Sequence, residues 1–332
     1  MYDVKVLGLV IILIATIIIS FRLGRYPIST KDLFAIFISK FCFVNHFWTD
    51  QTEGILFNIR LPRIVLACLV GCSLSAAGAS YQGIFQNPMA APDILGASAG
   101  AAFGAALAIL HYGNSQMITI SAFCFALLSV ALVYLISKRA KGQNTLGLIL
   151  SGIMVSSIFS AGTSYIKLVA DPNNQLPAIT YWLIGSLSGA TMNQIQFAII
   201  PMVTGLIVLF LLKWQLNVIT MGDNEARTMG VNAKLIRLLV IIFATMVTAA
   251  SVSVSGMIGW VGLVIPHLAR RIVGNNYKHL MPATMILGAI FLLAVDNVSR
   301  NLLATEIPLG ILTAFIGAPF FIYLITRKGE TY

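Results

Sequence analysis

Residues 220–231 form a polar stretch between two long apolar segments and carry Asp, Glu and Arg side chains. Gly222 permits a turn, Asp223 is a good helix N-cap and Gly230 suits the C′ position, so we expect a short capped helix. A capped surface helix offers recognition of another protein, and its contact residues would be Gly222, Asp223, Asn224, Glu225, Ala226, Arg227, Met229 and Gly230. A solvated loop without a partner is the alternative interpretation.

Arginines at the ends of two apolar segments are a second group of candidate binding residues. Arg60 and Arg63 flank Pro62 at the start of one segment, and Arg300 lies in an expected outer loop that begins at Asp296. Guanidinium groups in such places either reach lipid headgroups or form an exposed basic patch for an acidic partner. Asp296 lies four residues before Arg300 and could instead hold it in an i,i+4 pair.

Small polar residues form a stripe along one predicted helix, because Ser156, Ser160 and Thr163 share a face at 100° per residue. The stripe either lines an aqueous path or packs closely against a neighbouring helix, since small residues serve both purposes. Lys167 at the end of the stripe agrees with the first interpretation.

Side chains that carry enzyme chemistry are not grouped in this sequence. His267 has no second His or Cys at metal-ligand spacing, and the four cysteines have no paired spacing. The sequence also lacks the G-x-x-x-x-G-K-[ST] loop that binds ATP phosphates. We therefore expect no enzyme activity, no metal site and no cofactor on this chain, so that energy from ATP would arrive through a partner.

The composition indicates an integral membrane protein. Of 332 residues, 58% are hydrophobic and only 10% are charged, and the mean hydropathy is +0.90. Soluble proteins carry about 25% charged residues, and the apolar segments are too long for barrel strands. We expect an all-α, polytopic membrane protein with one transmembrane domain over residues 1–332. The net charge of +10 comes from loop Lys and Arg, which indicates topology and not nucleic-acid binding.

About ten apolar segments are candidates to cross a bilayer, which takes about 17–25 residues per helix, and the eighth is short. They are Val6–Phe21, Ile64–Tyr81, Ile94–Leu110, Met117–Ser137, Leu146–Ile166, Ile195–Leu212, Leu238–Met257, Ile258–Leu268, Leu280–Val295 and Pro308–Thr326. None of them contains Asp, Glu, Lys or Arg. This argues against the main alternative function, an ion-coupled secondary transporter, whose relay needs ionisable groups inside the membrane.

Loop charges give the expected orientation. Lys and Arg residues around 138–141, 213–237, 270–278 and 327–328 fall on one side of the predicted spans. Because positive loops stay in the cytoplasm, we expect both termini and the loop 213–237 to be cytoplasmic.

Several motifs, taken in order, resemble the permease subunits of type II ABC importers for iron–siderophore, haem and vitamin B12. They are Gln86–Ala101, Met221–Val231 and Gly256–Arg271, with Ile307–Ile311 and Gly317–Phe321 as a fourth. The resemblance covers nearly the whole chain. It implies a vitamin B12 permease-like fold in a bacterial inner membrane.

The resemblance also implies partners. They are a second copy of the chain, two ATPase subunits that bind ATP, an extracytoplasmic solute-binding protein and membrane lipid. The cargo would be a metal chelate, with an iron–siderophore as the first expectation and haem or vitamin B12 as alternatives.

The same likeness assigns roles to individual residues. The segment Met221–Val231 would be a coupling helix that enters a cleft of the ATPase, and the three arginines named above would meet acidic residues of the binding protein. The remaining matches are gate residues: Asn87 and Met89 at one cytoplasmic gate, and Asn144 and Thr145 at a second.

Overall fold

The computed structural model describes residues 2–40, 45–139 and 144–326, and each regular element in these ranges is a helix. Every predicted apolar segment corresponds to one of them: α1 (Tyr2–Arg22), α4 (Leu61–Ile84), α5 (Ala97–Leu110), α6 (Ser115–Arg139), α7 (Asn144–Val169), α9 (Met192–Leu211), α12 (Ala233–Ser255), α13 (Val261–Val273), α14 (Tyr277–Asn301) and α15 (Leu309–Thr326). Among the described residues, seven helices are long and apolar enough to cross a membrane, and α5 and α15 are shorter apolar helices. The predicted all-α membrane fold is confirmed.

Short elements lie between the long helices: α2 (Thr30–Ser39), α3 (Asp50–Ile55), the π-helical η1 (Leu56–Arg60), α8 (Gln175–Ile184), α10 (Lys213–Ile219) and α11 (Asp223–Thr228). The short helix that the polar stretch predicts is α11. It follows α10 within the loop 213–237.

Two predicted boundaries are wrong. α3, η1 and α4 form one continuous helix over residues 50–84, so Arg60 and Arg63 lie inside it and not at its start. The π-turn lies directly before Pro62, whose missing N–H and ring disturb a regular α-helical ladder. α14 continues through Asn301, so Asp296 and Arg300 are helical rather than part of an outer loop.

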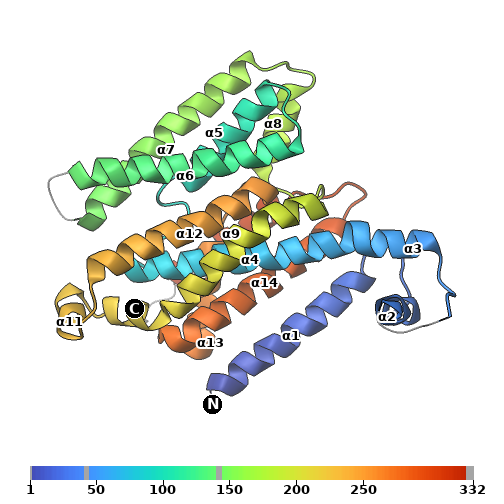
Figure 1. Ribbon diagram of the computed structural model, residues 1–332, viewed down its shortest axis with the longest axis horizontal. Coiled ribbons are helices and arrows are strands. Elements are labelled where there is room, and N and C mark those ends of the chain that lie inside the picture. The colour runs from blue at the N-terminus through green and yellow to red at the C-terminus, as the bar shows by residue number, and fades with distance from the viewer. Residues whose placement is uncertain (1, 41–44, 140–143, 327–332) are drawn as a thin grey trace.

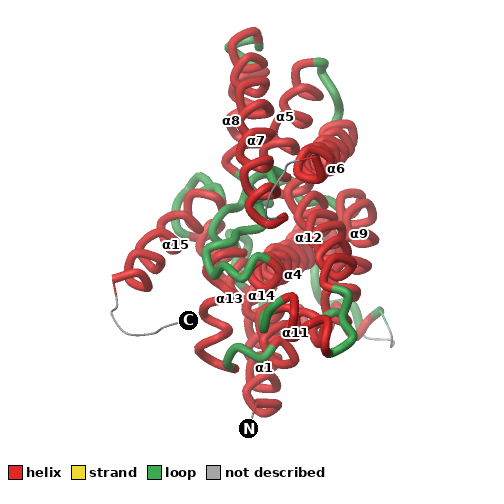
Figure 2. Tube along the Cα trace, turned by 90° about the vertical axis from the view of Figure 1, so that its left-hand side faces the viewer, coloured by secondary structure: helices red, strands yellow, loops and turns green. Residues whose placement is uncertain are grey.

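The helices α4, α12 and α14 lie side by side at the centre of the bundle, with α5 to α8 on one side and α1 on the other (Figure 1). α15 extends away from the bundle in the second view (Figure 2). The central helices are closely packed, because a Cβ atom on Gly71 of α4 would lie 2.2 Å from the carbonyl oxygen of Gly288 in α14. Small residues permit this backbone approach.

The elongated bundle has two ends, which we name after the elements they carry. The α11 end holds α11 and the start of α12, and the α2 end holds α2 and α3 (Figure 1). α1 begins toward the α11 end, where Lys5 Nζ donates a hydrogen bond to Ile272 O at 2.7 Å. The candidate binding residues are divided between these two ends.

Candidate functional sites at the two ends of the bundle

A glycine with φ in the left-handed region lies at each end of helix α11. Gly222 is the N-cap residue with φ 126°, and Gly230 follows the helix with φ 76°. The N–H of Val231 donates to Ala226 O at 2.8 Å and that of Gly230 to Arg227 O at 3.0 Å, which is the Schellman pattern of a helix end. The prediction for Gly230 is confirmed. The prediction that Asp223 is the N-cap is wrong, because Asp223 is the first helical residue.

Asp223 binds a neighbouring helix instead of capping its own. Arg237 of α12 donates from Nη1 to Asp223 Oδ2 at 2.8 Å and from Nη2 to Oδ1 at 2.6 Å. This bidentate hydrogen bonding lowers the pKa of the Asp223 carboxyl below its ordinary value. The carboxylate therefore ties α11 to α12.

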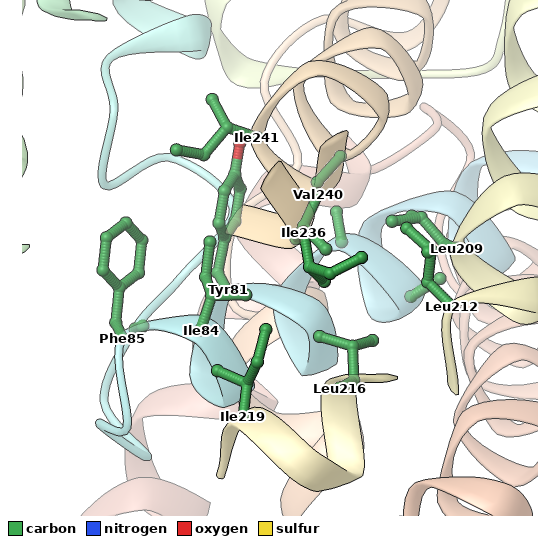
Figure 3. Close-up of a cluster of buried hydrophobic side chains, with 14 of the residues drawn as sticks. Tyr81, Ile84, Phe85, Leu209, Leu212, Leu216, Ile219, Ile236, Val240 and Ile241 are labelled. Carbon is green, nitrogen blue, oxygen red and sulfur yellow. The ribbon is translucent and has the colours of Figure 1, made fainter. Parts of the chain in front are cut away.

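A buried residue anchors α11 to the bundle from the other side. Ala226 has no exposed surface and belongs to the same hydrophobic cluster as Ile219 of α10 and Ile236 of α12. Figure 3 shows this cluster, in which α4, α10 and α12 meet. The outer side of α11 is exposed: Met221 and Met229 are 61% and 51% exposed, and its exposed polar residues include Asn224, Glu225 and Arg227.

Hydrogen bonds connect the α11 region to the loop 85–96, which contains the first predicted gate. Arg237 Nε donates to Ile84 O at 3.4 Å, and Gln86 Nε2 donates to Ile219 O at 2.8 Å. Inside the loop, Asn87 Oδ1 accepts from the N–H of Met89 at 2.9 Å. The Met89 side chain is 49% exposed.

His267 fixes the same loop from α13, because its Nε2 donates to Pro88 O at 2.9 Å. Asn144 and Thr145, the second predicted gate, begin α7, and their side chains lie outside the described residues. Within the described ranges, no group of three His, Cys, Asp or Glu side chains is placed to hold a metal ion.

The three residues of the predicted stripe on α7 lie in different environments. A Cβ on Gly96 would lie 2.5 Å from Ser156 Oγ, so Ser156 packs against the start of α5. Thr163 is 7% exposed and donates to Phe159 O at 2.9 Å. Ser160 is exposed. Close packing therefore accounts for two of the three residues.

Sequence reasoning missed a row of exposed hydroxyl groups on α7, in which Ser157 and Ser164 flank Ser160. The i, i+3, i+7 spacing of the three serines was the available signal. Ser157 donates to Ile153 O and Ser164 to Ser160 O, both at 2.9 Å. The hydroxyl donors of Ser157 and Ser164 are therefore already used within the helix.

Sequence reasoning also missed an apolar cavity of about 730 Å³, which opens between α8, α15 and the segment that links α12 to α13. Its lining includes Leu183, Met257, Trp260, Ile311 and Phe315. Trp260 has φ 70°, which is uncommon for a bulky residue, and a Cβ on Gly317 would lie 2.5 Å from its Cβ. The glycine-rich motif Gly256–Trp260 was the signal for this break between helices.

The three arginines lie together near the α2 end, but they do not form an exposed patch. Arg60, Arg63 and Arg300 are only 4%, 4% and 7% exposed. The expectation of an exposed basic surface is therefore wrong for this arrangement. Each guanidinium group contacts residues from other parts of the chain, which cover it from solvent.

The partners of Arg63 and Arg300 are charged. Arg63 Nε donates to Asp296 Oδ1 at 2.8 Å, and Arg63 Nη1 donates to both carboxylate oxygens of Glu306 at 3.0 and 2.9 Å. Arg300 Nε lies 3.1 Å from Asp296 Oδ2, which is the i,i+4 pair anticipated above. Arg300 also donates to Ser20 Oγ of α1 at 2.8 Å.

Arg60 differs from the other two arginines because it pairs with no carboxylate among the described residues. It donates to the backbone carbonyls of Phe21 and Tyr26. Together the three arginines join α1, the long helix 50–84, α14 and the loop 302–308. We name these side chains, with Asp296 and Glu306, the arginine cluster.

The model of the FecCD transport family matches residues 12–327 of this chain. The chain is 38% identical over 331 residues to the molybdate import system permease protein of Haemophilus influenzae. This alignment covers 99% of this chain and 98% of the Haemophilus protein. It is 36% identical over 329 residues to the Fe(3+)-citrate import system permease protein of Bacillus subtilis, covering 96% and 94% of the two chains.

A solved structure has the same architecture. It is described as an inward-facing conformation of a transporter of the metal-chelate ABC type, and it superposes with a TM-score of 0.87 at 38% identity. The match covers 96% of this chain and 98% of the solved one.

Proposed function

The chain belongs to the FecCD transport family, and from this membership we propose that it is the membrane permease subunit of an ATP-binding cassette importer for a metal chelate. The observation that carries the proposal is α11, which is anchored to the bundle through Ala226 and exposes charged and apolar side chains outward. A helix held in this way can transmit the motion of a partner that binds ATP. In this proposal the α11 end faces the cytoplasm and the α2 end faces outward.

The contact with the ATPase would use α11 and its flanking residues. Met221 and Met229 supply exposed apolar surface, and Glu225 and Arg227 supply charges of both signs. The hydrogen bonds from Arg237 and Gln86 would then carry a displacement of α11 to the loop 85–96. The gate residues Asn87 and Met89 lie in that loop, and Asn144 and Thr145 are proposed as the second gate.

The cargo that we propose first is an iron–siderophore complex. The ferric citrate permease among the relatives supports iron held by oxygen ligands as the class. The molybdate permease identifies the main competing cargo, a small oxyanion. Haem and vitamin B12 are the two other cargoes to compare with the iron–siderophore complex.

We further propose that two copies of the chain enclose the path. α15 extends from the bundle, and its exposed apolar residues include Phe315 and Ile322, at 76% and 62%. A second copy would cover this surface together with the 730 Å³ cavity. The exposed Ser160 of α7 is our candidate for a path residue.

The solute-binding protein would dock at the α2 end, above the arginine cluster. Direct ion pairs with Arg60, Arg63 or Arg300 require these side chains to exchange their present partners, because each is less than 10% exposed. Docking through charges should weaken as ionic strength rises. Binding measurements on nanodisc-held permease across a salt series test this part of the proposal.

Transport by proteoliposomes tests the function itself. The permease and its ATPase are reconstituted together, and uptake is compared for iron held by a hydroxamate siderophore, haem, vitamin B12 and molybdate. We expect uptake that requires ATP and that a protonophore does not abolish. Uptake that follows an imposed proton or sodium gradient without ATP would establish the secondary-transporter alternative instead.

A further inference from the structure

Glu306 closes the arginine cluster from outside. It lies in the loop 302–308 between α14 and α15, and both its oxygens accept from Arg63 Nη1. Ser299 holds the loop against α14, since its Oγ donates to Ile307 O at 2.6 Å. The Glu306 side chain is 28% exposed, whereas the side chains of Arg63 and Asp296 are 5% and 0% exposed. A partner outside the chain therefore meets Glu306 before it meets Arg63.

The carboxylates of the cluster do not contribute equally. Asp296 is fully buried and shared, at 2.8 Å from Arg63 Nε and 3.1 Å from Arg300 Nε. Glu306 is the more exposed carboxylate on Arg63 and comes from a loop rather than from a helix. Removing a carboxylate from a buried guanidinium is costly unless another anion takes its place.

The pairing of Arg63 with Glu306 also leaves one hydrogen-bond donor of Arg63 unused. Its Nη2 is buried and donates no hydrogen bond within the described part of the chain. Glu306 uses Nη1 for both of its oxygens, so it does not form the parallel two-nitrogen pairing that arginine and carboxylate prefer. An incoming carboxylate that used both terminal nitrogens would therefore be a better partner.

We propose that Glu306 is a built-in substitute for a carboxylate of the docking protein. In the undocked chain, the loop 302–308 covers Arg63 and keeps its charge paired. When a partner with an acidic surface docks, one of its carboxylates replaces Glu306, and the loop moves aside with its exposed Leu302 and Leu303. This inference rests on the proposed docking at the α2 end.

The exchange explains how buried arginines can select an acidic partner. One carboxylate replaces another, so the ion pair is kept and the guanidinium is never left without an anion. A partner with a neutral side chain in that position would displace Glu306 without replacing its charge. The loop thus restricts access to Arg63 to carboxylate or a similar anion.

The accessibility of Arg63 can be measured without the partner. The permease in nanodiscs is treated with phenylglyoxal, which modifies accessible arginines, and each site is quantified by peptide mass spectrometry. Arg227 is the exposed reference, and Arg300, whose hydrogen bonds go to Ser20 and Asn297, is the buried reference. The variants are Glu306→Ala and Glu306→Gln, and the matched control is Glu53→Gln, which removes an ion pair with Lys40 elsewhere in the same region.

We expect Glu306→Ala to raise the modification rate of Arg63 at least tenfold, with Glu306→Gln between it and the wild type. The rates at Arg300 and Arg227, and all rates in Glu53→Gln, should be unchanged. Citrate at millimolar concentration should restore the protection of Arg63 in Glu306→Ala, whereas choline chloride at equal ionic strength should not. This arm tests whether a carboxylate from solution can take the place of Glu306.

Two results would overturn the inference: Arg63 remaining as protected as Arg300 in both Glu306 variants, or citrate protecting no better than choline chloride. Neither outcome depends on the binding protein, so failure of the docking proposal is distinguishable. If Arg63 is exchangeable by these criteria but binding of the solute-binding protein shows no salt dependence, the substitution holds and the docking assignment fails.

Discussion

Arg237 holds Asp223 with both terminal nitrogens, at 2.8 and 2.6 Å, and so joins α11 to the helix that follows it. The same guanidinium reaches the C-terminal end of α4 through Ile84 O. α11 is therefore not an independent surface loop. A partner that pushes on α11 also pushes on α12 and on the end of the helix that leads into the loop 85–96.

The first prediction concerns the integrity of α11. Ala226→Pro removes the hydrogen bond from Ala226 to Gly222 O and puts a ring inside the helix, which costs about 3 kcal/mol. We expect ATP-driven uptake to be lost while the protein still inserts in the membrane. The matched control is Ala233→Pro, because Ala233 is the first residue of α12, where proline is tolerated. Equal uptake by the two variants would contradict a coupling role for α11.

The second prediction concerns pH. Arg237 lowers the pKa of Asp223 from its ordinary value of 3.8, so the stability from this contact is fully present above that value and is lost as pH falls through the lower folded pKa. Hydrogen exchange of α11 amides should stay constant from about pH 7 down to about pH 4, after correction for intrinsic rates, and should rise only in stronger acid. Asp223→Asn should exchange faster throughout and lack the acid transition. An acid transition of the same size in Asp223→Asn would show that another group controls it.

The sequence predicted the parts of this fold that depend on local patterns. Long apolar segments located each of the expected helices, and Gly230 marked the end of α11 because a left-handed φ favours glycine. The environment of the arginines was not predictable in this way. Arg63 binds Asp296 and Glu306, which lie 233 and 243 residues away in sequence, and no local pattern reports such pairing.

Tertiary packing also decided between alternatives that the sequence left open. Ser156 and Ser160 are equally small and polar, but Ser156 packs against Gly96 while Ser160 is exposed. Periodicity places both on one broad face of α7 and cannot say where the neighbouring helix ends. The cavity beside Trp260 was missed for a similar reason, since three separate segments line it.

The third prediction concerns the path. If the exposed row on α7 lines it, Ser160→Cys should react with a charged, water-soluble thiol reagent at least ten times faster than Ile158→Cys, which is 70% exposed on a more apolar part of the helix. Ser156→Cys should be protected by its packing against Gly96 and should react only in a state that separates α7 from α5. Rates are measured in a background without the native cysteines. Equal labelling at Ser160 and Ile158 would remove the row from the path.

The fourth prediction concerns the packing of α4 against α14. A Cβ on Gly288 would lie 2.2 Å from Ser75 Oγ and 2.3 Å from Gly71 O, so Gly288→Ala must push the two helices apart. We expect a lower thermal midpoint by several degrees. Gly8→Ala in α1 is the control, because beyond the adjacent backbone of α1 no atom of the described residues lies within 4 Å of its Cβ position. Alanine also favours a helix by about 1 kcal/mol over glycine. The two substitutions should therefore change stability in opposite directions, and a shift of the same sign would contradict the close contact.

The last prediction compares two arginines of equal burial. Arg60 and Arg63 are both 4% exposed, but Arg60 donates to backbone carbonyls, whereas Arg63 pairs with Asp296 and Glu306. Removing one partner of a buried ion pair costs about 3–5 kcal/mol because the other charge stays buried. Losing one hydrogen bond from a charged group to a neutral carbonyl costs about 1.5–3 kcal/mol. Arg60→Gln leaves only neutral acceptors behind, and the glutamine amide can still donate to one of them, so we expect a smaller loss at this position.

Arg63→Gln should therefore unfold at lower denaturant concentration than Arg60→Gln, and Arg63→Gln combined with Glu306→Gln should recover part of the loss. The recovery distinguishes charge from packing, since the double variant leaves no unpaired Glu306, keeps the pair between Asp296 and Arg300, and keeps the altered side-chain volume at position 63. Unfolding is followed in mild detergent, with Arg25→Gln as a control at an exposed arginine whose hydrogen bond to Leu303 O is 3.4 Å. If the double variant is no more stable than Arg63→Gln, packing rather than ion pairing stabilises the arginine cluster. Its charges would then contribute to docking and not to folding stability.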